Sequence, residues 1–143
     1  HFYFTKYAIP LLKANQGGSI INISSTAGLF GFPHRTPYAA SKWAVIGMTK
    51  SLAMELGDFN VRVNAICPGS VSGDRMGRVI EAKAKSIGVS EQELQQDYES
   101  MVSLNTFVDK EDIASMALFL ISNEAKRISG QVMTVDGNTE RMT

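Results

Sequence analysis

The stretch Val61-Arg-Val-Asn-Ala-Ile-Cys-Pro-Gly69 carries more information about the fold than any other part of the sequence. Its first six residues are mostly apolar and include two valines and an isoleucine, which is typical of a buried strand in a parallel sheet. The Pro-Gly pair ends the run, because proline cannot donate to a sheet ladder and glycine favours a turn. We therefore predict a strand over residues 61–66 that stops at a tight turn.

Two more short apolar runs, residues 19–24 and 131–135, predict further strands on either side of this one in the chain. Segments with helical periodicity precede or separate them at residues 2–14, 36–56 and 109–122. Strands joined by long helical crossovers indicate a parallel sheet with helices on both faces. The expected fold class is therefore α/β, with about three strands and flanking helices.

The ends of the expected helices have recognisable signals. Thr36 is a plausible N-cap with Pro37 at the first helical position, and Gly57 stops that helix after about Leu56. Asp109 is expected to cap the helix that follows it. The first helix shows apolar residues at helical spacing, namely Phe4, Tyr7, Ala8, Leu11 and Leu12. Residues 25–36 are expected to form a loop, and residues 73–104 a polar segment with one short helix, marked by the capping-box pair Ser90 and Glu93.

Composition excludes several classes of protein. The chain has 143 residues, of which 44% are hydrophobic, so it is long and apolar enough to bury one hydrophobic core. Its formal net charge is zero, so no basic surface for nucleic acid is expected. Its apolar runs are too short for a membrane span. The single cysteine, Cys67, excludes an internal disulfide and fits a reducing, cytoplasmic location. With His1 and His34 as the only other soft ligands, no metal site is expected.

Tyr38-Ala-Ala-Ser-Lys42 is the candidate site motif, with Ser25 upstream. Positions i and i+4 lie on one face of a helix, so the ammonium of Lys42 can lie beside the Tyr38 ring. A nearby ammonium favours the ionised form of a phenol, which otherwise titrates near pH 10. A serine at the end of the preceding strand would complete a three-group site that moves a proton at a carbonyl.

Two longer stretches surround these residues: Asn22-Ile-Ser-Ser-Thr-Ala-Gly28 and Asn64-Ala-Ile-Cys-Pro-Gly-Ser-Val-Ser72. Together with the Tyr-x-x-x-Lys pair, they resemble the short-chain dehydrogenase/reductase family, from about Phe2 to the C-terminus. The resemblance implies a Rossmann-like, doubly wound parallel sheet. No Gly-x-Gly-x-x-Gly turn for a dinucleotide occurs, so residues 1–143 are expected to be the C-terminal part of a single domain of this family.

The resemblance also implies roles for individual residues. Tyr38 would be the catalytic acid/base, Lys42 would support it and bind a ribose hydroxyl, and Ser25 would hold the substrate oxygen. The nicotinamide of NAD or NADP would lie against a second group of residues: Pro68, Gly69, Val71 and Ser72. Ser72 replaces the family's usual threonine. The companion active-site asparagine of the family lies before Phe2 in the pattern, and Asn22 is not that residue.

The implied activity is hydride transfer between NAD(P) and a small ketone or secondary alcohol. Two alternatives stay open: a non-catalytic fragment that serves only as a structural or assembly unit, and a sugar-nucleotide epimerase or dehydratase, which also uses a Tyr-x-x-x-Lys pair. The family's pairing of helices across a two-fold axis implies a homo-oligomer.

Phe30, Phe32 and residues 73–104 occupy the places where this family builds its substrate pocket. Within that segment, a loose run of basic residues is interpreted as a solvated face rather than a phosphate site; its members are Arg75, Arg78, Lys83 and Lys85. Asn64 is interpreted as structural, satisfying backbone groups in a buried neighbourhood.

Overall fold

The computed structural model describes residues 1–142. Its helices and strands follow one another as α1 (Phe2–Ala14), β1 (Gly18–Ile23), α2 (Thr36–Glu55), β2 (Val61–Pro68), α3 (Asp74–Ile87), α4 (Glu91–Glu99), α5 (Lys110–Ile121) and β3 (Val132–Val135). Short 3₁₀ turns lie at Thr26–Gly28, Gly57–Phe59 and Asn123–Ala125. All three predicted strands and the three long predicted helices are confirmed, with ends that shift by one or two residues.

The sheet has the order β1-β2-β3, and both pairings are parallel. Ile20 pairs with Val63 across the first ladder, and Ala65 pairs with Val132 across the second. The expected α/β fold with a parallel three-strand sheet is confirmed. Because the strands are parallel, their carboxyl ends lie at one edge of the sheet, the edge where such folds bind ligands.

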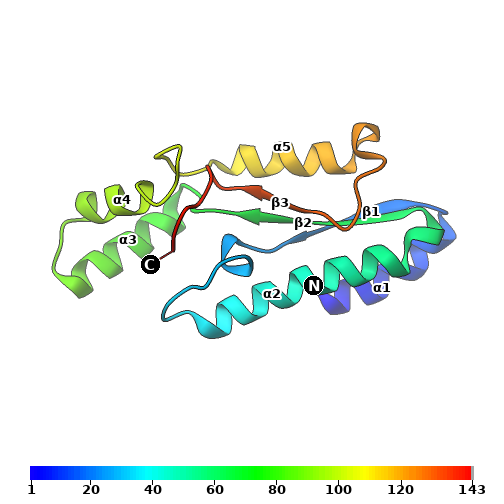
Figure 1. Ribbon diagram of the computed structural model, residues 1–143, viewed down its shortest axis with the longest axis horizontal. Helices are drawn as coiled ribbons and strands as arrows, with labels where there is room; N and C mark the ends of the chain where they lie inside the picture. Colours follow the sequence, from blue (N-terminus) through cyan, green and yellow to red (C-terminus); the bar gives the residue numbers. More distant parts are fainter. Residues whose placement is uncertain (143) are drawn as a thin grey trace.

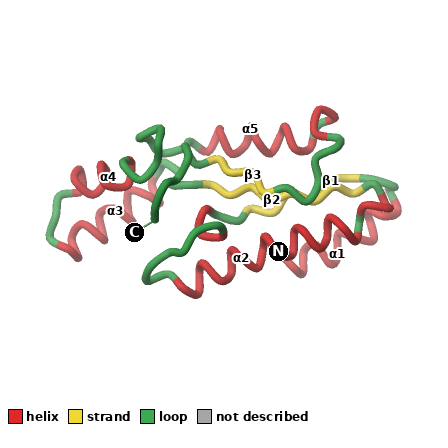
Figure 2. Tube along the Cα trace, viewed as in Figure 1, coloured by secondary structure: helices red, strands yellow, loops and turns green. Residues whose placement is uncertain are grey.

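Helices cover both faces of the sheet, with α1 and α2 on one face and α5 on the other (Figure 1). The same three-layer arrangement is clear when the chain is coloured by secondary structure (Figure 2). On the first face, a buried cluster of Leu56, Val61 and Val63 is joined by Ile9 and Leu12 of α1. Within residues 1–142, no helix combines the length and apolar character needed to cross a membrane.

On the opposite face, hydrogen bonds join β2 to the segments that pack on it. Arg62 donates from Nη1 to the backbone oxygen of Leu120, a fully buried residue of α5, at 2.5 Å. Asn64 is fully buried, donates to the oxygen of Ile128 and accepts from the amide of Gln131. The prediction that Asn64 satisfies buried backbone groups is therefore confirmed.

Two helix starts test the sequence signals. Ser90 and Glu93 form the predicted capping box, in which the Glu93 amide donates to Ser90 Oγ and the Ser90 amide donates to the Glu93 carboxylate. The prediction of Thr36 as an N-cap is wrong by one residue, because Arg35 is the N-cap of α2. Its carbonyl already accepts from the amide of Ala39 at 2.9 Å, which places Thr36 inside the helix.

The prediction for residues 73–104 is incomplete, since α3 precedes the expected short helix α4. The apolar residues of α3 gather on one side of the helix and pack against α4: Ile80 and Ala84 contact Leu94 in a cluster separate from the main core. The helix ends at Gly88, which adopts a left-handed conformation (φ 75°) that glycine accommodates without strain.

The apolar spacing of the first helix correctly predicts α1, but its large side chains do not face the sheet. Phe4, Tyr7 and Leu11 are 87%, 73% and 73% exposed. The inward face is instead formed by Ile9 and Leu12, together with the buried Thr5. The helix therefore presents a second, uncovered apolar face.

Candidate active site

Two hydrogen bonds join the carboxyl end of β1 to a single residue of α2, Lys42. Lys42 donates from Nζ to the backbone oxygen of Ile23 at 3.3 Å, and Ser24 donates from Oγ to the backbone oxygen of Lys42 at 2.8 Å. Strand and helix thus meet at Lys42.

Gly28 permits this close approach. A Cβ atom at this position would lie 2.8 Å from Ser24 Oγ and 3.0 Å from the backbone oxygen of Lys42. Both distances are too short for an ordinary contact, so a side chain would push the 3₁₀ turn Thr26–Gly28 away from α2.

Tyr38 and Lys42 lie one helical turn apart on α2, on the same face. Lys42 Nζ is 5.6 Å from the centroid of the Tyr38 ring, which is the juxtaposition that the i, i+4 spacing predicts. The Tyr38 side chain is 38% exposed, so a solute can reach it from solvent. The serine between them, Ser41, is used locally and donates to the backbone oxygen of Tyr38 at 2.7 Å.

Ser25 directly follows the strand end and has an extended backbone (φ −171°, ψ 161°). Its Oγ accepts a hydrogen bond from the amide of Ala27 at 3.2 Å, which caps the 3₁₀ turn. Because the hydroxyl oxygen is the acceptor in this bond, its proton is left to donate to another group.

Cys67 lies beneath these residues at the end of β2 and has no exposed surface. Burial raises the pKa of its thiol above the ordinary value, against the opposing effects of a hydrogen bond with the Ser25 backbone and the charge of Lys42. Cys67 is thus a small buried residue near the end of a strand. Its location below Ser25 could not be read from the sequence.

Pro68 ends β2, and Gly69 makes the turn against the backbone that follows β3. A Cβ at Gly69 would lie 2.9 Å from Cα and 2.8 Å from Cβ of Asp136, and the Gly69 amide donates to the oxygen of Val135 at 3.0 Å. Contact with Asp136 therefore already requires a glycine at position 69, independently of the nicotinamide that the family resemblance implies there.

After this turn the chain pairs briefly with the segment that enters α5. The amide of Ser72 donates to the oxygen of Val108, and the Val108 amide donates to the oxygen of Ser70, which forms a parallel bridge between Val71 and Val108. Alternate residues of a strand point their amides to opposite edges, so the amide of Val71 points away from this bridge.

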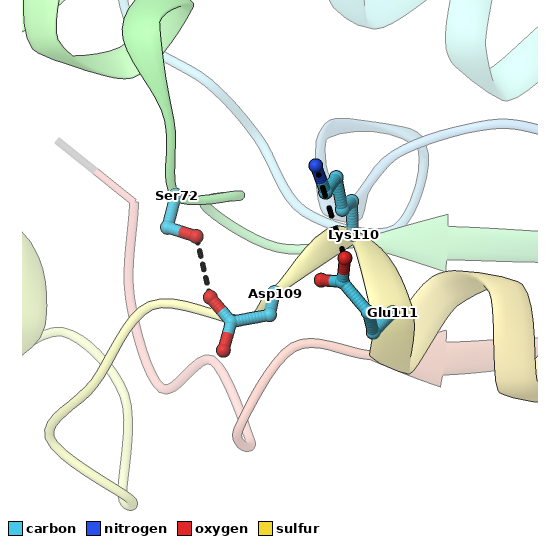
Figure 3. A network of polar contacts seen from close by, with 4 residues as sticks. All are labelled: Ser72, Asp109, Lys110 and Glu111. Atoms are coloured by element: carbon cyan, nitrogen blue, oxygen red, sulfur yellow. Dashed lines mark hydrogen bonds and ion pairs between the residues drawn. The ribbon is translucent and has the colours of Figure 1, made fainter.

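Ser72 is tied to the N-cap of α5. Its Oγ donates to Oδ1 of Asp109 at 2.5 Å, as Figure 3 shows beside the exposed ion pair of Lys110 and Glu111. The Ser72 hydroxyl therefore gives its proton to Asp109, whereas its oxygen can still accept a hydrogen bond. No sequence signal marked Asp109 as a partner of Ser72, because 37 residues separate them.

The structure thus places Ser25 and Lys42 where β1 meets α2, with Tyr38 one helical turn before Lys42, and it brings Pro68 to Ser72 to the carboxyl edge of the sheet. His34, in the loop before α2, has a left-handed backbone (φ 60°). Over residues 1–142, no group of three or more metal-ligating side chains is present.

Known proteins are similar to this chain in sequence and in fold. A family profile described as Enoyl-(Acyl carrier protein) reductase matches residues 1–138. The chain is 42% identical over 137 residues to trans-4-hydroxycyclohexanecarboxylate dehydrogenase of Sinomonas cyclohexanicum, covering 96% of this chain and 46% of the relative. It is 38% identical over 136 residues to the 3-oxoacyl-[acyl-carrier-protein] reductase FabG of Thermotoga maritima, covering 95% and 51%. The chain therefore spans about half the length of these relatives.

Solved structures give the same result. A short chain dehydrogenase family protein from Francisella tularensis superposes with a TM-score of 0.85 at 34% identity, covering 94% of this chain and 57% of that one. An NAD+-bound xylitol dehydrogenase gives a TM-score of 0.89 at 27% identity, with shares of 96% and 55%. The actinorhodin polyketide ketoreductase with NADPH gives 0.81 at 35% identity, with shares of 87% and 48%. The matched profile, the relatives and the common fold together show that this chain belongs to the short-chain dehydrogenase/reductase family.

Proposed function

We propose that the chain is the C-terminal part of a single short-chain dehydrogenase/reductase domain and that the whole protein transfers a hydride between NAD(P) and a ketone or secondary alcohol. Tyr38 is the acid/base of this reaction. The observation that carries the proposal is the location of the Lys42 ammonium, 5.6 Å from the Tyr38 ring and bonded to the strand end beside Ser25.

The residues at the strand ends fit a nicotinamide nucleotide. The ammonium of Lys42 has three donors and gives one of them to the backbone oxygen of Ile23, so it can also bind a ribose hydroxyl. Val71 directs its amide away from the bridge to Val108, and Ser72 keeps acceptor capacity; both suit a carboxamide. When bound, the nicotinamide supplies or accepts the hydride. Similar structures hold NAD+ or NADPH, which supports both forms of the cofactor as candidates.

The protein groups move the proton. Ser25 donates its free hydroxyl proton in a hydrogen bond to the carbonyl oxygen, which orients the substrate. Tyr38 gives its phenolic proton to that oxygen as the carbon receives the hydride, and the product is the alcohol. In the oxidation direction, the phenolate of Tyr38 takes the alcohol proton as the hydride leaves the carbon. Lys42 stabilises the phenolate in both directions through its positive charge.

A homo-oligomer is part of this proposal. Large apolar side chains are exposed on two helices: Phe4, Tyr7 and Leu11 on α1, and the half-exposed Trp43 on α2. The two helices lie on the same side of the sheet (Figure 1). Contiguous exposed apolar surface is characteristic of association sites.

The decisive test is Tyr38→Phe in the protein expressed from the complete reading frame. General acid/base groups contribute about 10²–10⁴-fold to rates, so we expect a loss of turnover of about that size. Affinity for NADH or NADPH, followed by nicotinamide fluorescence, should change little. Tyr7→Phe, an exposed tyrosine on α1, is the matched control. Turnover retained in Tyr38→Phe would remove the tyrosine from its role.

The fragment alternative is tested on residues 1–143 alone, which span only about half of the relatives. Titration with NADH and NADPH distinguishes the two cases. No change in nicotinamide fluorescence at millimolar nucleotide would assign the isolated chain a structural role only.

A further inference from the structure

We propose that a basic groove between the start of α2 and α3 binds a phosphate ester group of the substrate. The groove is a hollow of about 500 Å³ whose basic lining residues, here called the basic groove, are Arg35, Arg75, Arg78 and Lys83. The inference rests on the proposed function, because it assigns a substrate class to the same active site.

Three of the four basic residues share one face of α3. Arg75, Arg78 and Lys83 recur at helical spacing, with Val79, Ala82 and Ser86 completing the lining on that helix. Lys85 of the same helix is exposed but does not line the hollow. The proposal departs from the sequence interpretation of this basic run as a solvated face, because Arg35 joins it from another part of the chain.

The charges of the basic groove are not neutralised by carboxylates. Among the described residues, the one ion pair joins Lys110 to Glu111 on α5, and neither residue lines the groove. Asp74 and Glu81 lie on α3 but do not line the hollow. Lys83 contacts a neutral partner instead, with Nζ 3.4 Å from the Tyr98 hydroxyl. Arg35 lies over the ring of Phe32 at 5.8 Å.

Guanidinium groups suit phosphate in particular, because their planar donors form paired hydrogen bonds with phosphate oxygens. Arg35 is also the N-cap of α2, where the helix dipole adds positive potential. A dianionic phosphate is therefore the ligand that this charge arrangement best complements.

The basic groove lies close to the reacting group. Arg35 precedes Tyr38 by three residues, less than one helical turn. From Arg75 to Ser86 the groove follows α3 for eleven residues, or about 17 Å at 1.5 Å per residue. A substrate whose carbonyl reaches Tyr38 can thus place its phosphate on the arginines. The phosphate can belong to a small phosphorylated polyol or sugar, or to the phosphorylated arm of an acyl carrier.

The first test measures binding of inorganic pyrophosphate by calorimetry to the protein expressed from the complete reading frame. We expect Arg75→Gln with Arg78→Gln to weaken binding at least about tenfold, since charged hydrogen bonds are lost. Glutamine is a good helix former, and both sites are exposed, so α3 should persist; circular dichroism checks this. Lys85→Gln is the matched control and should bind as the unsubstituted chain does. No binding by the unsubstituted chain, or an equal loss in Lys85→Gln, would overturn the proposal.

The same measurement separates this inference from the proposed activity. Tyr38→Phe should bind pyrophosphate unchanged, because the phenol does not line the hollow. Activity lost in Tyr38→Phe together with intact pyrophosphate binding supports both proposals. Activity retained in Tyr38→Phe with binding lost in the arginine variants defeats only the proposed catalytic role.

A competition arm identifies the source of the phosphate. Coenzyme A and fructose 6-phosphate are each titrated against bound pyrophosphate. Stronger displacement by coenzyme A assigns the basic groove to a carrier arm, and stronger displacement by the sugar phosphate assigns it to a small substrate. Failure of both to displace pyrophosphate would contradict recognition of a phosphate ester.

Discussion

At the residue scale, the active-site edge depends on glycines that allow backbone segments to touch. Gly28 lets the turn after β1 contact Lys42, and Gly69 lets the turn after β2 contact Asp136. In both cases the neighbouring atoms include backbone, which cannot rotate away as a flexible side chain would. These contacts are therefore strict requirements of the packing.

Gly69→Ala should lower the free energy of unfolding by about 1–3 kcal/mol, the usual cost of forcing an extra methyl into a packed site. The added Cβ would meet Asp136 Cα at 2.9 Å. Gly47→Ala on α2 is the control, because a Cβ there meets nothing within 4 Å; it should stabilise the helix by about 0.5–1 kcal/mol. Urea unfolding measures both. Equal stability of the two variants would refute the role of this contact.

Cys67 gives a pH-dependent prediction. Burial raises the pKa of its thiol above an ordinary value of 9.0, so the unfolded chain loses this proton before the folded chain does. The resulting stabilisation is fully present below pH 9 and is lost as the pH rises above it. We expect the free energy of unfolding to fall more steeply between pH 9 and 10 than in Cys67→Ala, about 1.4 kcal/mol per pH unit at most. Parallel slopes would contradict this.

At the element scale, the acidic residues at the start of α5 differ in what they contribute: Asp109 and Asp112 cap the helix, whereas Glu111 is exposed. The backbone amide of Asp109 donates to Oδ2 of Asp112 at 2.8 Å, and Asp109 also holds Ser72. Glu111, between them in sequence, forms an exposed ion pair with Lys110 at 3.8 Å (Figure 3). The contributions of the Asp109–Asp112 capping bond and of the Lys110–Glu111 ion pair to stability can therefore be compared within one helical turn.

Asp112→Ala should reduce the free energy of unfolding by about 1 kcal/mol, because it leaves the Asp109 amide without its partner. Glu111→Ala should change it by less than about 0.5 kcal/mol, since exposed ion pairs contribute little. Thermal unfolding followed by circular dichroism compares them. If Glu111→Ala proved the more damaging, the capping argument would fail.

Sequence patterns were sufficient for the buried strands and for helices with clear end signals. The apolar runs at β1, β2 and β3 correctly predict a parallel sheet, and the capping residues correctly predict α4 and α5. Helix α3 was missed because charged residues dominate its sequence and its apolar face packs on α4, which is itself mostly polar. The exposure of Phe4 on α1 was also unpredictable, because spacing shows that a face is apolar but not what covers it.

Within the site, contacts between residues of one helix could be predicted from the sequence, whereas contacts between distant segments could not. The approach of Lys42 to Tyr38 follows from helical geometry and was predictable. The bond from Ser72 to Asp109 and the meeting of Arg35 with α3 join segments about 40 residues apart, and only the folded chain reveals them. The roles of Ser25, Pro68 and the other site residues stay predictions until variants are measured.

At the scale of the whole molecule, the uncovered face of α1 predicts association. Tyr7→Glu with Leu11→Glu should shift the protein toward smaller assemblies, because charges would have to be buried in the contact. Leu118→Glu is the control, on α5 at the opposite face of the sheet (Figure 1). Light scattering after size-exclusion chromatography measures the masses. An unchanged mass in the α1 variant, or an equal shift in the control, would place the contact elsewhere.

The separate small core of α3 and α4 has a consequence for how this protein can diversify. Ile80, Ala84 and Leu94 pack on one another and on Phe107, and the bridge between Val71 and Val108 joins the two ends of this excursion. The segment has its own small interior, and its other backbone bonds join residues 101–104 to residues 137–140. Because α2 and the sheet are absent from its packing cluster, 73–107 can be exchanged between relatives together with 137–140. Grafting both segments should therefore transplant selectivity while the proton-transfer machinery stays native.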